Sequence, residues 1–148
     1  MKTIISTLMI SLALSMAPAA VIAQQAPSQE EVKVLYHIDN AQAQGIKGLR
    51  NIRNHLDVAP KTKITVVMHA NGVDLVMDGA QDQKSKTEYA PLVSALVSRG
   101  VVFEVCEITL RNRKLKKDQF LLEATFTPSG VVRIADLQVK QKFAYIKP

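Results

Sequence analysis

The chain has 148 residues, 47% of them hydrophobic, and a formal net charge of +6 at pH 7. This length suits one domain with its own core, and the moderate positive charge suits anionic partners. We expect no nucleic-acid binding, because the chain has no tryptophan and no aromatic residues interleaved with its basic run to stack on bases. Its single cysteine cannot form an internal disulfide.

Residues 1–23 have the pattern of a secretory signal peptide. Lys2 is their only charge, residues 4–16 are almost wholly apolar, and small residues end the segment at Ala23. We therefore predict cleavage after Ala23 and a periplasmic location. An uncleaved membrane anchor is the alternative, although the serines and Pro18 within the segment oppose it. No second apolar stretch of spanning length follows, so we expect no membrane span after cleavage.

For the rest of the chain we predict a short flexible lead-in, residues 24–31, and a single domain, residues 32–148. In the first half of the domain we expect a strand over 32–38, a helix over 46–56 that Asp39 or Asn40 caps, and a buried strand over 64–69. A loop with one helical turn over 70–88 follows, and then a short helix that begins at Pro91 and ends before Gly100.

In the second half we expect a strand over 101–106, a basic helix over 109–115 capped by Thr109, a connection over 116–123, a strand over 124–127, a helix capped by Ser129, and a closing strand over 143–146. Strands and helices alternate throughout. The pattern predicts an α/β fold, a three-layer α/β/α sandwich with a mainly parallel, flavodoxin-like sheet of about five strands.

The carboxyl ends of parallel strands share one edge of the sheet, where open α/β folds place their functional groups. Three of the predicted strands have polar or reactive residues at or just beyond this end, namely His37, His69, Asn71 and Cys106. The histidines are candidate proton carriers or ligands, and structural hydrogen bonds at the strand ends are the alternative for both. The chain has no P-loop, GxGxxG, HExxH or CxxC motif, so we predict no cofactor and no resident metal ion.

Cys106 ends an apolar strand and precedes a helix with a basic run, residues 111–117. A helix N-terminus and nearby cations lower the pKa of a thiol, so Cys106 is the candidate nucleophile, with Arg111 and Arg113 as candidate anion-binding groups. Glu107 opposes this effect. The alternatives are a buried, idle thiol and a solvated basic helix face.

Several segments together resemble the DsrE/DsrF-like family. They are VLYHI at 34–38, LRNIRNHL at 49–56, VMHANGV at 67–73, RGVVFEVC at 99–106, TL at 109–110, PSGV at 128–131 and YIKP at 145–148. The resemblance implies a three-layer α/β/α fold and assembly into homo-oligomers. In sulfur-relay members of the family a cysteine at a strand end carries sulfur as a persulfide, and Cys106 matches that position.

Two differences separate this chain from the relay members. The relay members are cytoplasmic, whereas this chain has the pattern of an exported protein. Small residues follow the cysteine in the relay members, whereas here Glu107 and Ile108 follow it. The leading hypothesis is a periplasmic sulfur carrier, and possible sulfurtransferase, that exchanges sulfur with a donor or acceptor protein. The alternatives are a non-catalytic module that binds a small ligand or metal at the strand ends, and an oligomeric interaction protein with an idle thiol.

Overall fold

The computed structural model describes residues 31–148, so the predicted signal peptide and nearly all of the predicted lead-in lie outside the described residues. The elements in chain order are β1 Lys33–Asn40, α1 Ala41–Val58, β2 Lys63–Asn71, η1 Gly72–Val76, α2 Ala90–Val97, β3 Val102–Cys106, α3 Glu107–Arg113, η2 Lys117–Gln119, β4 Ala124–Thr127, α4 Gly130–Gln141 and β5 Ala144–Ile146. None of the helices among these residues is long and apolar enough to cross a membrane.

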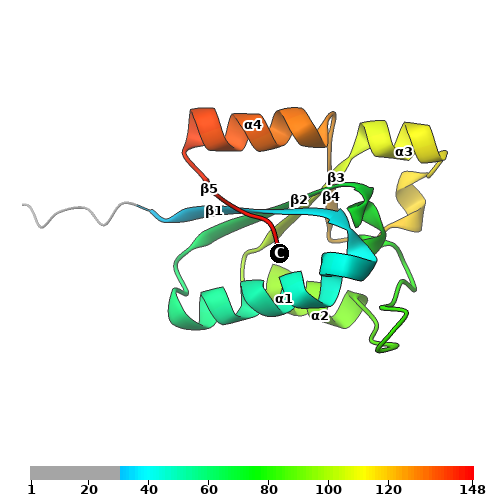
Figure 1. Cartoon of the computed structure of the whole chain (residues 1–148), viewed down its shortest axis with the longest axis horizontal. Coiled ribbons are helices and arrows are strands. Elements are labelled where there is room, and N and C mark those ends of the chain that lie inside the picture. The colour runs from blue at the N-terminus through cyan, green and yellow to red at the C-terminus, as the bar shows by residue number, and fades with distance from the viewer. Residues whose placement is uncertain (1–30) are drawn as a thin grey trace, which may run out of the picture.

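The five strands form one sheet in the order β4-β3-β2-β1-β5, and every neighbouring pair is parallel. Helices α1 and α2 cover one face of the sheet, and α3 and α4 cover the other (Figure 1). The predicted three-layer α/β/α class is confirmed. The sheet has its carboxyl ends along one edge, which is where the sequence predicted the candidate site.

Side chains of β2 alternate between two apolar clusters, because successive residues of a strand point to opposite faces. Ile64, Val66 and Met68 belong to the larger cluster beneath α1 and α2, whereas Val67 belongs to the smaller one beneath α4. All of these residues are almost completely buried. The near-continuous apolar run therefore marks a central strand covered on both faces, as predicted.

Two helices begin at the predicted caps. The Asn40 side chain accepts a hydrogen bond from the Ala43 amide at 3.0 Å, and Ser129 accepts one from the Val132 amide at 3.4 Å. Each cap satisfies an amide that the first helical turn leaves without a partner. With Asn40 as cap, α1 begins at Ala41, five residues before the predicted start, so its first turn includes polar residues outside the apolar periodicity.

The helix after Cys106 begins earlier than predicted. Cys106 itself is the N-cap of α3, which starts at Glu107 with no intervening loop. The prediction that Thr109 caps this helix is therefore wrong. Thr109 lies inside α3, buried, and its hydroxyl accepts a hydrogen bond from the Ala70 amide at 3.0 Å. The direct strand-to-helix transition places the thiol at the helix start.

The stretch predicted as a loop with one helical turn contains η1, Gly72–Val76. Gly72 comes so close to β1 that a Cβ atom there would lie 2.0 Å from the Ile38 carbonyl oxygen. Only glycine fits this contact, since any side chain would force the backbones apart. The contact fixes the chain just beyond β2 against the end of β1, beside the candidate site.

Candidate functional site

The first turn of α4 lies between Cys106 and His69. A Cβ atom built on Gly130 would lie 3.2 Å from the Cβ atom of Cys106 and 3.2 Å from that of His69. The strand ends thus place Cys106 and His69, which are 37 positions apart in the sequence, next to the same glycine. Only the absence of a side chain at Gly130 lets the helix approach both.

The His69 imidazole belongs to a chain of three side chains, defined here as the histidine chain, which includes His37 and Tyr145. The Tyr145 hydroxyl lies 2.6 Å from Nδ1 of His37, and Nε2 of His37 lies 2.7 Å from Nε2 of His69. Since one ring nitrogen must donate and the other accept, at least one of the two imidazoles is neutral. The arrangement can move a proton between half-buried His69 and half-exposed Tyr145.

Burial lowers the pKa of His37 below its ordinary value, and positive charge on His69 and Lys147 lowers it further. The Asp39 carboxylate acts in the opposite direction without reversing the shift. His37 is therefore neutral at pH 7, which suits it to pass a proton between Tyr145 and His69.

The Cys106 thiol is almost completely buried, with 4% of the residue exposed. Burial raises its pKa, but hydrogen bonds from the backbone amides of Gly130, Thr109 and Ile108 and from the Thr109 hydroxyl outweigh that effect. The net result is a pKa below the ordinary value for cysteine. These donors stabilise a thiolate, the form of cysteine that acts as a nucleophile.

The C-terminal residues hold Tyr145 against β1. Lys147 forms an ion pair with Asp39 at 2.5 Å, and the Pro148 carbonyl accepts a hydrogen bond from the Gln44 side chain at 3.2 Å. The hydrogen bond to Lys147 lowers the pKa of Asp39. Strand β5, which carries Tyr145, has only three residues, so these flanking contacts help to fix the hydroxyl beside His37.

Three of the predicted binding residues lie outside the histidine chain. Asn71 is exposed at the end of β2, and Arg111 is exposed on α3. Arg113 forms an ion pair with Asp74 at 2.7 Å and donates a hydrogen bond to the Ala70 carbonyl at 3.2 Å.

Charges near the thiol are largely paired. Glu107 pairs with Lys117 at 2.6 Å, and Lys117 also lies 4.7 Å from the centre of the Phe126 ring. The ion pair offsets the negative charge that Glu107 places next to the thiol. In this structure the hydrogen bonds of backbone amides and of Thr109 account for the lowered pKa of Cys106.

Tyr145 is the site residue that sequence reasoning missed. Its strand was predicted, but the strand order was not, and β5 meets β1 only because the chain returns to that edge of the sheet. A tyrosine in the last predicted strand does not by itself indicate a functional site. Within residues 31–148, no three His, Cys, Asp or Glu side chains are grouped closely enough to hold a metal ion.

Known proteins share this fold. A protein of unknown function from Methanobacterium thermoautotrophicum, MTH1491, superposes with a TM-score of 0.71 at 29% sequence identity, covering 80% of this chain and 100% of that chain. The ychN protein from E. coli gives a TM-score of 0.63 at 11% identity, with the same coverage. A search of curated proteins finds no significant match. The sequence pattern of the DsrE/DsrF-like family matches residues 11–148, and the chain belongs to that family.

Proposed function

We propose that this protein is a periplasmic sulfur carrier in which Cys106 accepts a sulfur atom and passes it to a partner. The observation that carries the proposal is the position of Cys106 at the end of β3 and the N-terminus of α3, where neighbouring hydrogen-bond donors lower the pKa of the thiol against the effect of burial. Membership of the DsrE/DsrF-like family, a family of the sulfur-relay type, supports the same chemistry. The predicted signal peptide supports the location.

The proposed reaction is an exchange of sulfur between thiols. The Cys106 thiolate attacks the outer sulfur of a persulfide on the donor, the donor's S–S bond breaks, and the donor leaves as a thiolate. Cys106 then carries the persulfide, and the thiolate of an acceptor attacks the outer sulfur and regenerates Cys106. One S–S bond forms for each one broken, so no external oxidant or reductant is needed.

We assign the histidine chain to proton handling in this exchange. The departing thiolate takes up a proton, and an incoming thiol gives one up. His69 lies across Gly130 from Cys106 and connects through His37 to Tyr145, which is 40% exposed. This chain offers a route for the proton between the thiol and the surface.

Access to the thiol requires a local movement. Gly130 and its helix turn cover Sγ of Cys106, since a Cβ atom at Gly130 would lie 3.6 Å from that sulfur. The covering turn is at the surface, where Val131 and Val132 are exposed. In the proposal, displacement of this turn by a partner admits the donor.

Self-association remains part of the proposal. The outer face of α4 carries exposed Val131, Val132, Ala135 and Val139, where an amphipathic helix facing solvent has polar residues. An apolar outer face of this kind is typical of an interface. Sedimentation of the protein, compared with a Val132→Asp variant, tests whether this face joins copies of the chain.

Intact-mass spectrometry tests the sulfur carrier directly. We expect the purified protein to gain the mass of one sulfur atom after exposure to thiosulfate or polysulfide, and to lose it on treatment with a reductant. The Cys106→Ser variant should fold, as shown by circular dichroism, and gain nothing. A folded wild-type protein that gains no sulfur, and whose thiol is alkylated only after denaturation, contradicts the proposal and makes Cys106 a packing residue.

A second candidate function is a non-catalytic module that binds a metal ion or small ligand at the strand ends. The two neighbouring imidazoles at the strand ends favour it, because a rotation that broke their 2.7 Å hydrogen bond would free both Nε2 atoms for a ligand. Titration with Zn²⁺ or Cu²⁺ separates the two functions. Metal binding that survives Cys106→Ser and is lost in His37→Ala supports this second function. Weak binding that His37→Ala does not change contradicts it.

A further inference from the structure

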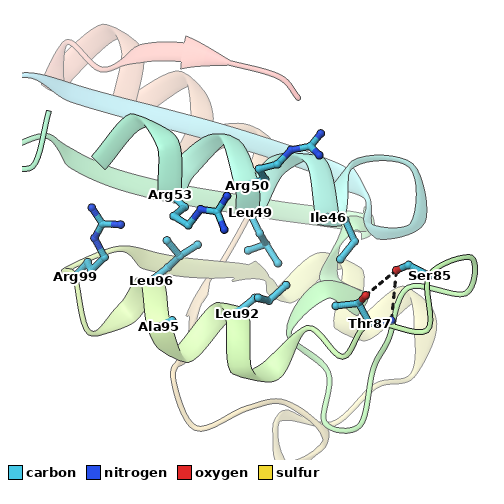
Figure 2. Close-up of a pocket in the computed structure, with 10 residues that line it drawn as sticks. All are labelled: Ile46, Leu49, Arg50, Arg53, Ser85, Thr87, Leu92, Ala95, Leu96 and Arg99. Atoms are coloured by element: carbon cyan, nitrogen blue, oxygen red, sulfur yellow. Dashed lines mark hydrogen bonds between the residues drawn. The ribbon is translucent and has the colours of Figure 1, made fainter. Parts of the chain in front are cut away.

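A groove on the opposite side of the sheet has no part in the sulfur chemistry. It lies between α1 and α2, encloses about 350 Å³ and is lined by Ile46, Leu49, Arg50, Arg53, Ser85, Thr87, Leu92, Ala95, Leu96 and Arg99 (Figure 2). Its volume falls within the range of about 300–1,000 Å³ that is typical of small-molecule sites.

Contacts at both ends of the helices hold the groove open. At one end the Tyr89 hydroxyl donates a hydrogen bond to the Ala41 carbonyl at 3.2 Å. At the other end Arg99 pairs with Asp57 at 2.8 Å. Between these two contacts the helices leave room that their own side chains do not fill, so the groove belongs to the folded framework.

A short loop closes one end of the groove. The Gln42 side chain donates to the Gln81 carbonyl at 3.1 Å and accepts from the Gln83 amide at 2.8 Å, which fixes the loop to the start of α1. Within the loop the hydroxyls of Ser85 and Thr87 lie 2.9 Å apart and face the groove (Figure 2). They supply polar groups beside an otherwise apolar floor.

The lining combines an apolar floor with positive charge. Leu49, Leu92 and Leu96 form part of the floor, and Leu92 is 37% exposed. Arg53 lies over this floor between the two helices, and Arg99 stands at one end (Figure 2). Within residues 31–148 no carboxylate lines the groove, and the one hydrogen bond that the Arg53 side chain makes there is to the Asn54 side-chain oxygen, at 3.4 Å.

We propose that this groove binds a single-chain alkyl carboxylate, with the hydrocarbon chain on the leucine floor and the carboxylate on Arg53. Charge complementarity selects an anion, because arginine binds a carboxylate through two parallel hydrogen bonds and no acidic side chain in the lining repels it. The recessed, apolar floor selects a monomeric amphiphile, since burying its chain removes apolar surface from water. The proposal is independent of the sulfur carrier.

Octanoate is the probe, and calorimetric titration of the purified protein measures its binding. We expect octanoate to bind at least tenfold more tightly than octan-1-ol, which lacks the charge, and than acetate, which lacks the chain. Arg53→Gln should weaken octanoate binding about tenfold. Lys140→Gln removes a cation from α4, on the other face of the sheet, and should change nothing.

A second variant fills the groove. Ala95 is exposed in the lining, so Ala95→Phe should abolish octanoate binding while leaving the melting temperature within a few degrees of the wild-type value. Equal binding of octanoate and octan-1-ol, or no effect of Arg53→Gln, overturns the proposal. A change of oligomeric state in the Ala95→Phe variant, measured by sedimentation, also overturns it and shows that the groove is an interface between copies.

Discussion

The two faces of the sheet differ in what they bury. The face beneath α1 and α2 holds the large apolar cluster, with residues such as Ile52, Leu75 and Phe103 completely buried. Beneath α4, within residues 31–148, the buried apolar cluster consists of Leu35, Val67, Leu137 and Phe143. The rest of that face carries His37, Glu104, Cys106 and Thr127, all buried polar or reactive groups.

One face of the sheet therefore contributes most of the stability, and the other face holds the groups that can react. A large apolar cluster contributes most of the free energy of folding, since burial of apolar surface is its main favourable term. A face with fewer apolar contacts can hold buried polar groups in the positions that reactions require. One half of the molecule is therefore mainly structural and the other half holds the reactive groups, and four experiments test that division.

The largest expected effect comes from a matched pair of leucines on the two faces. Leu56 on α1 and Leu137 on α4 are both completely buried, to within 1%. We expect Leu56→Ala to lower the free energy of unfolding by about 4–5 kcal/mol and Leu137→Ala by about 2–3 kcal/mol, because the smaller cluster collapses more easily around the cavity. Denaturant unfolding measures both. Equal losses contradict the division.

The ion pair beneath α4 should have the next largest effect. Arg133 donates two hydrogen bonds of 2.7 Å to the Glu104 carboxylate, which β3 holds in a mostly buried position. Arg133→Met leaves that carboxylate without its partner and should cost about 1.5–3 kcal/mol. The double variant Arg133→Met with Glu104→Leu should recover most of the loss. If the double variant is no more stable than Arg133→Met, the ion pair contributes more to stability than the neutralisation of a buried charge.

Gly130→Ala should have a smaller effect on stability and a clear effect on the thiol. The added methyl group meets Cys106 and His69 at 3.2 Å, so the turn moves outward at a cost of about 1 kcal/mol. The Gly130 amide then withdraws from Sγ, and the pKa of Cys106 should rise. The pH dependence of alkylation by iodoacetamide measures it, with Ala135→Gly on the same helix as a control that leaves the thiol unchanged.

The smallest expected effect is a pH dependence of stability. Burial lowers the pKa of His37, so the unfolded chain takes up this proton more readily than the folded protein. The free energy of unfolding should therefore fall as the pH drops below about 6.5, and His37→Gln should flatten that decline. Denaturant titrations at pH 7.5, 6.5 and 5.5 measure it. An unchanged slope in the variant assigns the decline to other groups.

Much of the fold followed from local patterns. The continuous apolar run of β2, the caps Asn40 and Ser129, and Pro91 at the start of α2 all predicted their elements, because each acts on neighbouring residues. The start of α3 was wrong by two residues. There the N-cap is a cysteine, which is not a typical capping residue, so nothing in the sequence marks the boundary.

The site was harder to predict, because it depends on strand order. The sequence placed His37, His69 and Cys106 at strand ends, and the parallel sheet brings those ends to one edge. It gave no indication that β5 lies beside β1, and so none that Tyr145 reaches His37. The backbone amides that lower the pKa of the Cys106 thiol cannot be recognised from residue types. Gly130 is the exception, because its missing side chain lets the helix approach the thiol.

The contact between β1 and β5 also has a consequence for the order of folding. His37 and Tyr145 are 108 positions apart, so closing this contact costs more chain entropy than pairing strands that are neighbours in the sequence. Strands β1 and β2 are separated by a single helix and can pair at a lower entropic cost. We therefore expect the histidine chain to be completed late in folding, after the centre of the sheet has formed.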